Sequence, residues 1–435
     1  MMERQLTSGP GGRILTNCNV WSPCGEWVVF DTRSDAAGSS FDGTRIQAVH
    51  VHTREVRTLY ESRNGACCGV ATWHPTELKV VFILGPEFPT AEYGYGASRR
   101  QGVVADLPSP LEGEGGRRLG EGLVMHSTPL PPGSLRSPGD LPLKGGGVHA
   151  APLDARDLTP PFTPGALRGG SHVHVWHPRG DWLSFTYDDD LVRDPQQRNV
   201  AVCFPRPVNV PKTHPRNHDG DHFSVIVTRT VPHPRDGSDE ISRACEEAWV
   251  GSSRTLAFQG TVNVNGKAVT EVFVAELPDD LTIPGDGPLE GTITTRPAPP
   301  KGVTQRRLTF GGIGGPRHWL RSSPDGSRIG FFRPDPAGVV QLWTVTLAGR
   351  TVQVTTGSQS VESCFTWHPD GERVACVIGG RVCLVDATTG AVQYLTDLSE
   401  HLPRPEACVV SPDGKRVAFV RHRPEGNQVC VAEVE

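Results

Sequence analysis

One short pattern recurs seven times along this chain, and it restricts the possible folds more than any other feature. Each copy has an aromatic or apolar strand end, a tight turn and a second strand with alternating apolar residues. In chain order the copies are WSPCGEWVVF from Trp21, WHPTELKVVF from Trp73, WHPRGDWLSF from Trp176, WVGSSRTLAF from Trp249, SSPDGSRIGF from Ser322, WHPDGERVACV from Trp367 and VSPDGKRVAFV from Val410. Every copy therefore predicts the first two strands of a repeating β unit.

The residues of the turn explain why each copy reverses the chain. In the copy from Ser322, Pro324 fixes φ at the first corner, Asp325 bonds the backbone ahead of it, and Gly326 takes the positive φ of the reversal. A second pair of strands follows each copy, and the pattern places the last strand of several units at 56–59, 156–159, 307–309, 352–355 and 394–396. Four strands per unit and seven units predict an all-β, seven-bladed β-propeller.

The two ends of the chain indicate how the ring closes. Residues 4–7 match the fourth-strand pattern but have no blade before them, whereas the last copy is followed by only one more strand, in QVCVAEVE. An N-terminal strand that completes the last blade leaves no exposed sheet edge. We therefore expect residues 1–435 to form one propeller closed in this way.

Composition limits the classes of partner. With 50 Gly and 39 Pro in 435 residues the chain is rich in turns, and its formal net charge of -5 gives no basic footprint for nucleic acid. It has no apolar segment long enough to span a membrane and no leader-like N-terminus, so we expect a cytoplasmic protein. The 11 cysteines are scattered without CxxC spacing and are expected to be small core residues.

Residues 107–147 differ in character from the rest of the chain. The segment has many Gly and Pro residues, almost no β-branched residues and no periodicity. Such a segment buries too little apolar surface to become ordered. We expect it to be a disordered insertion in blade two, between the third and fourth strands, and whether it has any role stays open at this point.

The repeat resembles that of TolB-like, WD-repeat-like propellers over nearly the whole chain. More narrowly, DARDLTPPFTPGALRGGSHVHVWHPRGDWLSFTYDD from Asp154 and NHDGDHFSVIVTRTVPHPRDGSDEISRACEEAWVG from Asn217 resemble the YidR-like family of uncharacterised bacterial propellers. That resemblance implies a fold without an activity. The expected function is binding of a small ligand, for example an acidic saccharide, or of a protein partner on the top face, over the central channel.

Candidate site residues are those that enter the first strand of a blade or leave the second, because these positions meet over the channel. His172 and His174 enter the first strand of blade three, and a spacing of two places both on one side of a strand, as two ligands of a divalent ion such as Mn, Zn or Fe require. The other candidate ligand-binding residues are Asn17, Asp31, Tyr187, Asp188, Asp189, Glu246 and Glu247.

Structural interpretations of the same residues stay open beside the functional ones. Propeller channels are commonly lined by polar residues and water, and the histidines can be satisfied by backbone carbonyls. Residues 238–249 read as a short helix capped by Ser238, which would account for the acids near its start. A second histidine cluster, His214, His218 and His222, is expected on the opposite face from His172.

An enzymatic alternative comes from oligogalacturonate lyases, whose repeat type resembles this one. That likeness implies a divalent metal and β-elimination from uronate oligosaccharides, with His172 and His174 as ligands, His318 as the base, and Arg33 or Arg317 holding the substrate carboxylate. Whether the protein is an enzyme stays open at this point. A serine peptidase is excluded, because the chain has neither a GxSxG motif nor room for a hydrolase domain.

Overall fold

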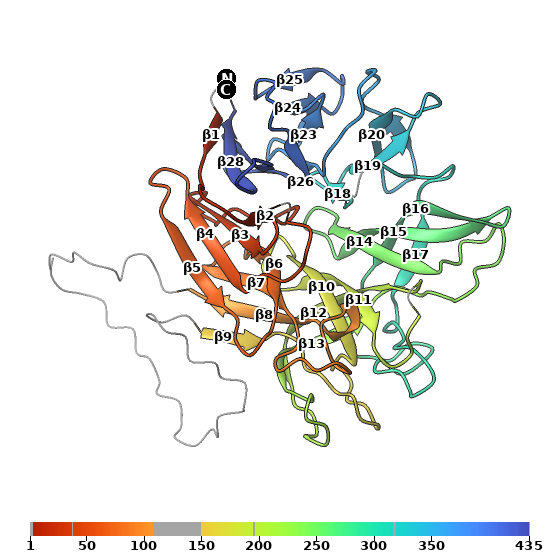
Figure 1. The fold of residues 1–435 in the computed structure, drawn as a ribbon. Helices are drawn as coiled ribbons and strands as arrows, with labels where there is room; N and C mark the ends of the chain where they lie inside the picture. The colour runs from red at the N-terminus through yellow and green to blue at the C-terminus, as the bar shows by residue number, and fades with distance from the viewer. Residues whose placement is uncertain (1–2, 37, 108–148, 195, 316–318, 435) are drawn as a thin grey trace, which may run out of the picture.

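The computed structural model describes residues 3–36, 38–107, 149–194, 196–315 and 319–434. Its described part contains seven four-stranded antiparallel sheets, arranged as blades around a central axis, and one short 3-10 helix, Ala97–Arg99. In Figure 1 the chain passes around the ring from the red blade through yellow and green to blue. The predicted seven-bladed β-propeller is confirmed.

The blades follow chain order, with the first strand of each nearest the centre (Figure 1). Blades 1 to 3 consist of β2 (Gly12–Ile14), β3 (Trp27–Arg33), β4 (Arg45–His50) and β5 (Val56–Glu61); β6 (Cys68–Trp73), β7 (Lys79–Leu84), β8 (Gln101–Asp106) and β9 (His149–Pro152); and β10 (Gly169–Trp176), β11 (Leu183–Asp189), β12 (Asn199–Val208) and β13 (Gly220–Ile226).

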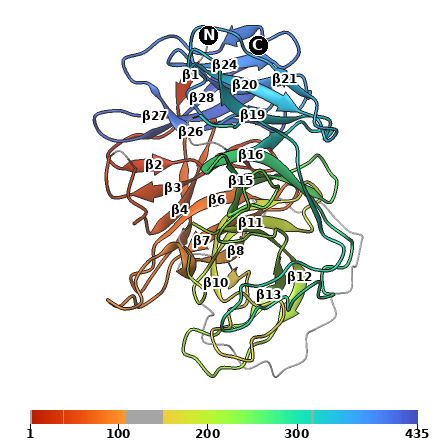
Figure 2. The ribbon, with the colours of Figure 1, turned by 90° about the vertical axis from the view of Figure 1, so that its right-hand side faces the viewer.

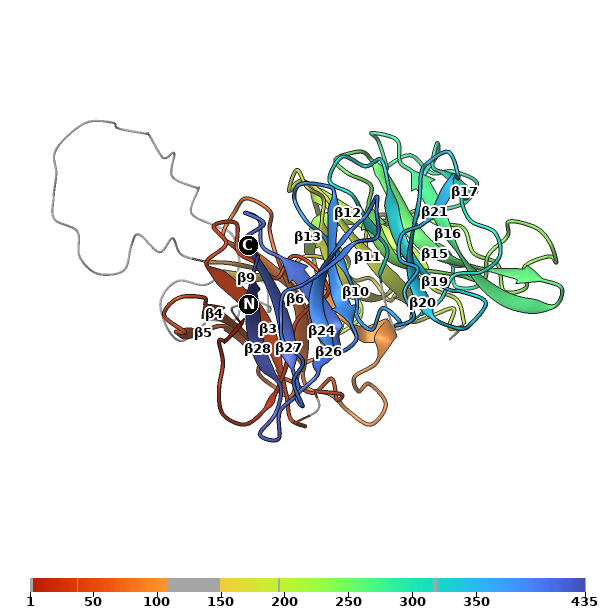
Figure 3. The ribbon, with the colours of Figure 1, turned by 90° about the horizontal axis from the view of Figure 1, so that it is seen from above.

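Blades 4 to 7 complete the ring. They consist of β14 (Arg243–Trp249), β15 (Thr255–Val264), β16 (Lys267–Glu276) and β17 (Thr304–Arg307); β18 (Arg321–Ser322), β19 (Ile329–Pro334), β20 (Val340–Val345) and β21 (Thr351–Gln353); β22 (Thr366–Trp367), β23 (Arg373–Ile378), β24 (Arg381–Asp386) and β25 (Val392–Tyr394); and β26 (Pro403–Val410), β27 (Arg416–Arg421), β28 (Gln428–Glu433) and β1 (Glu3–Gln5). The long hairpin β15–β16 extends outward from the ring (Figure 3).

The N-terminal strand closes the ring as the sequence predicted. β1 pairs antiparallel with β28, so that Glu3 lies opposite Ala432 and Gln5 opposite Cys430. The two ends of the described chain lie side by side in Figures 1 and 2. Blade 7 is therefore assembled from the two ends of the chain.

Tryptophan and histidine side chains that recur in the repeat join several blades to their neighbours. The indole Nε1 of Trp249 donates to the Val175 carbonyl of the preceding blade at 3.1 Å, and Trp21 and Trp367 make the same kind of bond. The histidine that follows the tryptophan contacts the next blade instead, since Nε2 of His177 lies 3.2 Å from the Ser253 carbonyl of that blade. His74 and His368 make the same kind of contact. These histidines therefore have a structural role between neighbouring blades.

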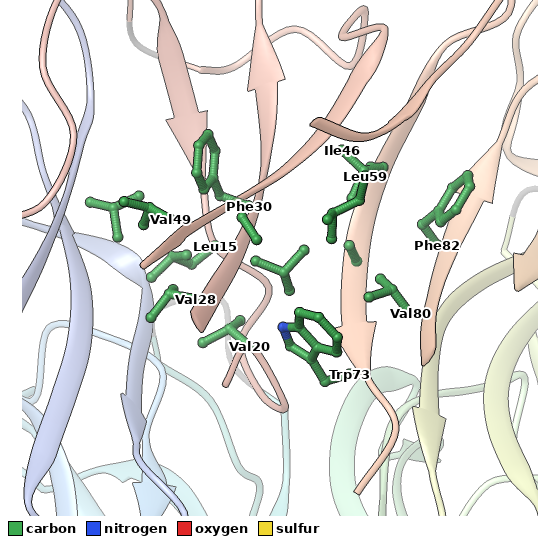
Figure 4. Packing of buried hydrophobic residues seen from close by; sticks show 14 of the residues in the cluster. Leu15, Val20, Val28, Phe30, Ile46, Val49, Leu59, Trp73, Val80 and Phe82 are labelled. Atoms are coloured by element: carbon green, nitrogen blue, oxygen red, sulfur yellow. The ribbon is translucent and has the colours of Figure 1, made fainter. Parts of the chain in front are cut away.

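Apolar side chains fill the layers between neighbouring blades. Figure 4 shows Phe30 and Leu59 of blade 1 with Val80 and Phe82 of blade 2, all of them buried in one cluster. Alternation along each strand supplies such residues to both faces of a blade, because each face packs against a neighbour. The core is thus a series of interblade layers, and the first strand of each blade lies nearest the central channel (Figure 1).

Two local predictions were wrong. Residues 243–249 form β14 and not the end of a helix, because Ala244, Ala248 and Trp249 alternate into the layers beside blade 4 and tertiary packing prevails over helix propensity. The fourth strand of blade 2 is β9, which precedes the predicted 156–159. The predicted insertion lies outside the described residues except for Leu107, whose N–H donates to the Leu78 carbonyl at 2.9 Å.

Three first strands share a backbone irregularity next to the channel. Val70, Val173 and Glu246 have φ of 59°, 56° and 58°, and the register of β6, β10 and β14 shifts at those points. Positive φ is strained for a β-branched residue such as valine. Each shift is a β-bulge that redirects the side chains on either side of it.

Candidate binding site in the central channel

A pocket with a cavity volume of about 150 Å³ lies in the channel where the first strands meet. It draws residues from blades 1, 2, 3 and 7 and from the segments that enter blades 5 and 6. Its lining consists of Ile14, Leu15, Thr16, Asn17, Asp31, Arg33, Val70, His172, Val173, Trp319, Cys364, Pro405 and Glu406. Four predicted site residues are therefore brought together here: Asn17, Asp31, Arg33 and His172.

The inner part of the pocket is apolar and follows the repeat. Val70, Val173 and Cys364 each stand three positions before the tryptophan of their copy, and Trp319 stands three before Ser322 of blade 5. Val173, Cys364 and Trp319 belong to one buried hydrophobic cluster, and Val70 packs against it. This position of the repeat thus supplies an apolar or weakly polar side chain to the pocket from blades 2, 3, 5 and 6.

Asp31 and Arg33 form an ion pair in the pocket wall. Arg33 Nη2 lies 2.6 Å from Asp31 Oδ2, and the Val70 N–H donates to the same oxygen at 3.3 Å. Burial raises the pKa of Asp31, although Arg33 beside it favours the charged carboxylate. Because only 8% of the Arg33 side chain is exposed, its guanidinium is held at the pocket with little freedom to turn away.

Arg100 is a second guanidinium, which lies behind His172 and outside the pocket lining, and it was missed by the sequence analysis. Its Nη1 donates to His172 Nδ1 at 2.7 Å, and its guanidinium carbon lies 5.2 Å from the Tyr95 ring centroid and 5.6 Å from that of Phe41. Burial lowers the pKa of Arg100. In the described part of the chain no carboxylate forms an ion pair with it. The residue lies in a long excursion outside the repeat, so no pattern marked it.

His172 and His174 do not share one side of their strand. Because β10 has its bulge between them, His172 lines the pocket, whereas His174 is fully buried between blades 2 and 3. The His174 ring lies 5.1 Å from that of Phe185, and a Cβ on Gly102 would be 2.6 Å from its Nε2. Burial lowers the pKa of His174. The argument from spacing failed because a period of two does not continue through a bulge.

The second histidine cluster lies nearer to His174 than expected. His222 forms a β-bridge with Asp154, and the Asp154 carboxylate affects the pKa values of His174, His218 and His222. Burial nevertheless lowers the pKa of His218 and of His222 to about 4. His172, which lines the pocket, is therefore separate from this second cluster, whereas His174 lies close to it.

The acidic residues that leave the second strand of blade 3 have structural partners. Tyr187 is 1% exposed, and its hydroxyl lies 3.1 Å from Asp189 Oδ2, which also receives Arg168 Nε at 2.9 Å. Asp188 pairs with Arg198, again at 2.9 Å. None of the three predicted ligand-binding residues lines the channel pocket, and Tyr187 and Asp189 instead serve a buried ion-pair network.

The two glutamates ahead of blade 4 also lie outside the pocket lining. Glu247 is fully buried and accepts a hydrogen bond of 3.0 Å from the Thr186 hydroxyl. Burial raises its pKa to about 7, against the opposing effects of Thr186 and Arg321. Glu246 is half-buried at the bulge of β14, where its carbonyl accepts from the Leu320 N–H. Arg317 and His318, the predicted clamp and base, lie outside the described residues.

The described donor groups do not fit a divalent metal. Among the residues that the structure describes, no three or more His, Cys, Asp or Glu side chains are placed to hold an ion. The Arg100 guanidinium occupies Nδ1 of His172, and a fixed cation there opposes a metal cation. No helix in the described part of the chain is long and apolar enough to cross a membrane.

Fold and site together define a seven-bladed β-propeller with a ligand-sized pocket over its channel. The uncharacterized protein YidR of Escherichia coli (strain K12) is 41% identical to this chain over 449 residues, which cover 99% of this chain and 97% of YidR. The chain therefore belongs to the YidR family, as the sequence resemblance implied. A protein family of unknown function, DUF3748, matches residues 67–139 and 144–218.

Solved structures show the same fold at low sequence identity. An oligogalacturonate lyase from Vibrio parahaemolyticus is 9% identical with a TM-score of 0.54, covering 100% of this chain and 93% of its own. An oligogalacturonate lyase in complex with manganese is 10% identical with a TM-score of 0.55 and the same coverage. A puromycin hydrolase mutant is 12% identical with a TM-score of 0.54, covering 98% of this chain and 52% of its own. These likenesses concern the fold alone.

Proposed function

We propose that this protein binds a small anionic molecule in the channel pocket. The observation that carries the proposal is the presence of two guanidinium groups, Arg33 in the pocket lining and Arg100 directly behind His172. Arg33 is matched by Asp31, and Glu406 is matched by Arg404, whose Nη2 lies 2.5 Å from Glu406 Oε1. Arg100 adds a further guanidinium beside His172 without an ion-pair partner among the described residues.

A carboxylate is the group that these two guanidinium groups favour. Guanidinium groups bind carboxylates through charge-assisted hydrogen bonds, and these are stronger when the groups are shielded from water. Arg33 and Arg100 are held in place by their pairing and by the Phe41 and Tyr95 rings, so little order has to be gained on binding. The ligand would supply the missing negative charge.

Isothermal titration calorimetry with small carboxylates tests the proposal. Arg100→Gln should weaken the binding of a carboxylate by about tenfold or more, since a charge-assisted hydrogen bond contributes about 1.5–3 kcal/mol. Arg179→Gln, a change of the same charge in the exposed turn between β10 and β11, is the matched control and should bind as the wild type does. Failure of every carboxylate tried to bind at millimolar concentration would contradict the proposal.

A metal-dependent elimination from uronate oligosaccharides is the second candidate. It is supported by the fold likeness to oligogalacturonate lyase, one structure of which holds manganese, and by the position of Arg33 and His172 in the pocket. The predicted ligands His172 and His174 lie apart, so we derive no step through a metal. Stoichiometric Mn, Zn or Fe in the purified protein, together with an absorbance gain from unsaturated uronate, would favour this candidate over simple binding.

A further inference from the structure

The inner pocket offers little to a ligand rich in hydroxyl groups. Leu15, Val173, Cys364 and Trp319 present apolar or weakly polar side chains, and each of them is buried. The acceptors Asn17 Oδ1 and Asp31 Oδ2 are already used by Arg321 and Arg33. A sugar hydroxyl placed against the apolar side chains would lose its bonds to water without full replacement.

The volume of the pocket limits the size of the ligand. A cavity of about 150 Å³ lined by apolar side chains is large enough to hold one benzene molecule. Two linked sugar rings exceed that space. The pocket therefore fits one ring, or a branched aliphatic group of the same size.

The basic side chains of the pocket come from blades 1 and 3, and the acid Glu406 of blade 7, which also lines the pocket, is already paired with Arg404. Arg33 and His172 come from blades 1 and 3, and Arg100 stands behind His172 at 2.7 Å. Trp319 and Cys364 enter from blades 5 and 6, elsewhere around the channel. A ligand that satisfies both parts has a carboxylate at one end and an apolar body at the other.

We propose that the pocket takes a small monocarboxylate with one apolar ring, of the size and chemistry of benzoate or phenylacetate. This inference rests on the proposed function and names the class of its ligand. The carboxylate contacts Arg33 and the His172–Arg100 pair, and the ring contacts Trp319, Val173 and Cys364. The ligand class differs from the uronate oligosaccharides that the fold likeness suggests.

Three small molecules separate the contribution of the carboxylate from that of the apolar ring. Benzoate carries both features, galacturonate has the same charge on a hydroxylated ring, and benzyl alcohol has the ring without the charge. By calorimetry at pH 7.5 we expect benzoate to bind about tenfold or more tightly than either of the others, because burial of one ring contributes on the order of 2 kcal/mol.

A variant that fills the pocket tests the location. Val70→Phe places a ring in the lining and should weaken benzoate binding at least about tenfold, whereas Val56→Phe, at an exposed position of the outer strand β5, should leave it unchanged. Thermal unfolding checks that both variants fold. If Val70→Phe does not fold, Cys364→Met fills the same space with a more flexible side chain.

The outcomes distinguish this inference from the proposed function. Galacturonate binding as well as or better than benzoate would overturn the apolar ligand class and leave an anion site in place. Benzyl alcohol binding as well as benzoate would overturn the carboxylate, and with it the proposed function. Binding of neither anion at concentrations up to about 10 mM, which corresponds to roughly -3 kcal/mol, would overturn both this inference and the proposed function. Unchanged benzoate binding in a folded Val70→Phe variant would overturn the location of the site.

Discussion

The guanidinium of Arg421 in β27 bonds both carboxylate oxygens of Glu3 in β1, with Nε–Oε1 and Nη2–Oε2 distances of 2.6 Å. The Arg421 side chain is 1% exposed, and that of Glu3 is 24% exposed. The strand between them, β28, makes the main-chain bonds of the closure. This ion pair therefore links the N-terminal strand to blade 7 across an intervening strand.

Loss of the Glu3 carboxylate should weaken the closure. Glu3→Ala leaves the buried Arg421 without its ionic partner, and we expect the free energy of unfolding to fall by about 2–3 kcal/mol in urea denaturation, less than for a fully buried pair because Glu3 is partly exposed. Glu61→Gln removes a carboxylate from the exposed pair with Arg45 and should change stability by less than about 0.5 kcal/mol. Equal effects of the two variants would contradict a special role for Arg421.

Gly102 leaves space that His174 fills. A Cβ there would lie 2.6 Å from His174 Nε2 and 3.0 Å from Leu153 Cδ2, both in the layer between blades 2 and 3. Gly102→Ala should therefore lower the free energy of unfolding by about 1–3 kcal/mol. Gly96→Ala, where a Cβ meets nothing within 4 Å, serves as the control in the same denaturation series.

Glu247 should make stability depend on pH in the sense opposite to a salt-bridged acid. Burial raises its folded pKa to about 7, so the folded protein keeps a proton that the unfolded chain releases near its ordinary pKa of 4.5. The free energy of unfolding therefore falls as pH rises from 4.5 to 7, by at most about 3 kcal/mol.

Replacement of Glu247 isolates that contribution. Glu247→Gln should be more stable than the wild type at pH 8 and nearly equal to it at pH 4.5, because glutamine resembles the protonated acid and does not titrate. Urea denaturation at both pH values measures the difference, in which all other titrating groups cancel. Parallel pH profiles for the two proteins would show that Glu247 is not buried as described.

We expect that a short turn can replace residues 108–147 without loss of stability. Asp106 and His149 are paired opposite each other at the ends of β8 and β9, and Leu107 packs against the core of blades 1 and 2. A variant with Asn-Gly in place of 108–147 keeps Leu107 and gives a four-residue hairpin loop. We expect its melting temperature to stay within a few degrees of the wild type, and a larger fall in a thermal scan would show that the segment stabilises the fold.

The repeat explains why the fold was predictable and the site less so. Three tryptophans of the repeat bond to the preceding blade and three of its histidines to the following blade, so local pattern and global ring agree. The bulge at Val173 breaks the period of two on which the pairing of His172 with His174 was based. Arg100 belongs to no repeat, and only its contact with His172 in the folded chain reveals it.

Because blade 7 is built from both ends of the chain, it can be completed only at the end of synthesis. Ribosomes make β1 first and β28 only after six blades have emerged, so the nascent chain carries its N-terminal strand without a partner throughout that time. A chain released early has no β28 and cannot seal the ring, whatever the quality of its other blades. Closure by the two ends thus distinguishes finished chains from truncated ones.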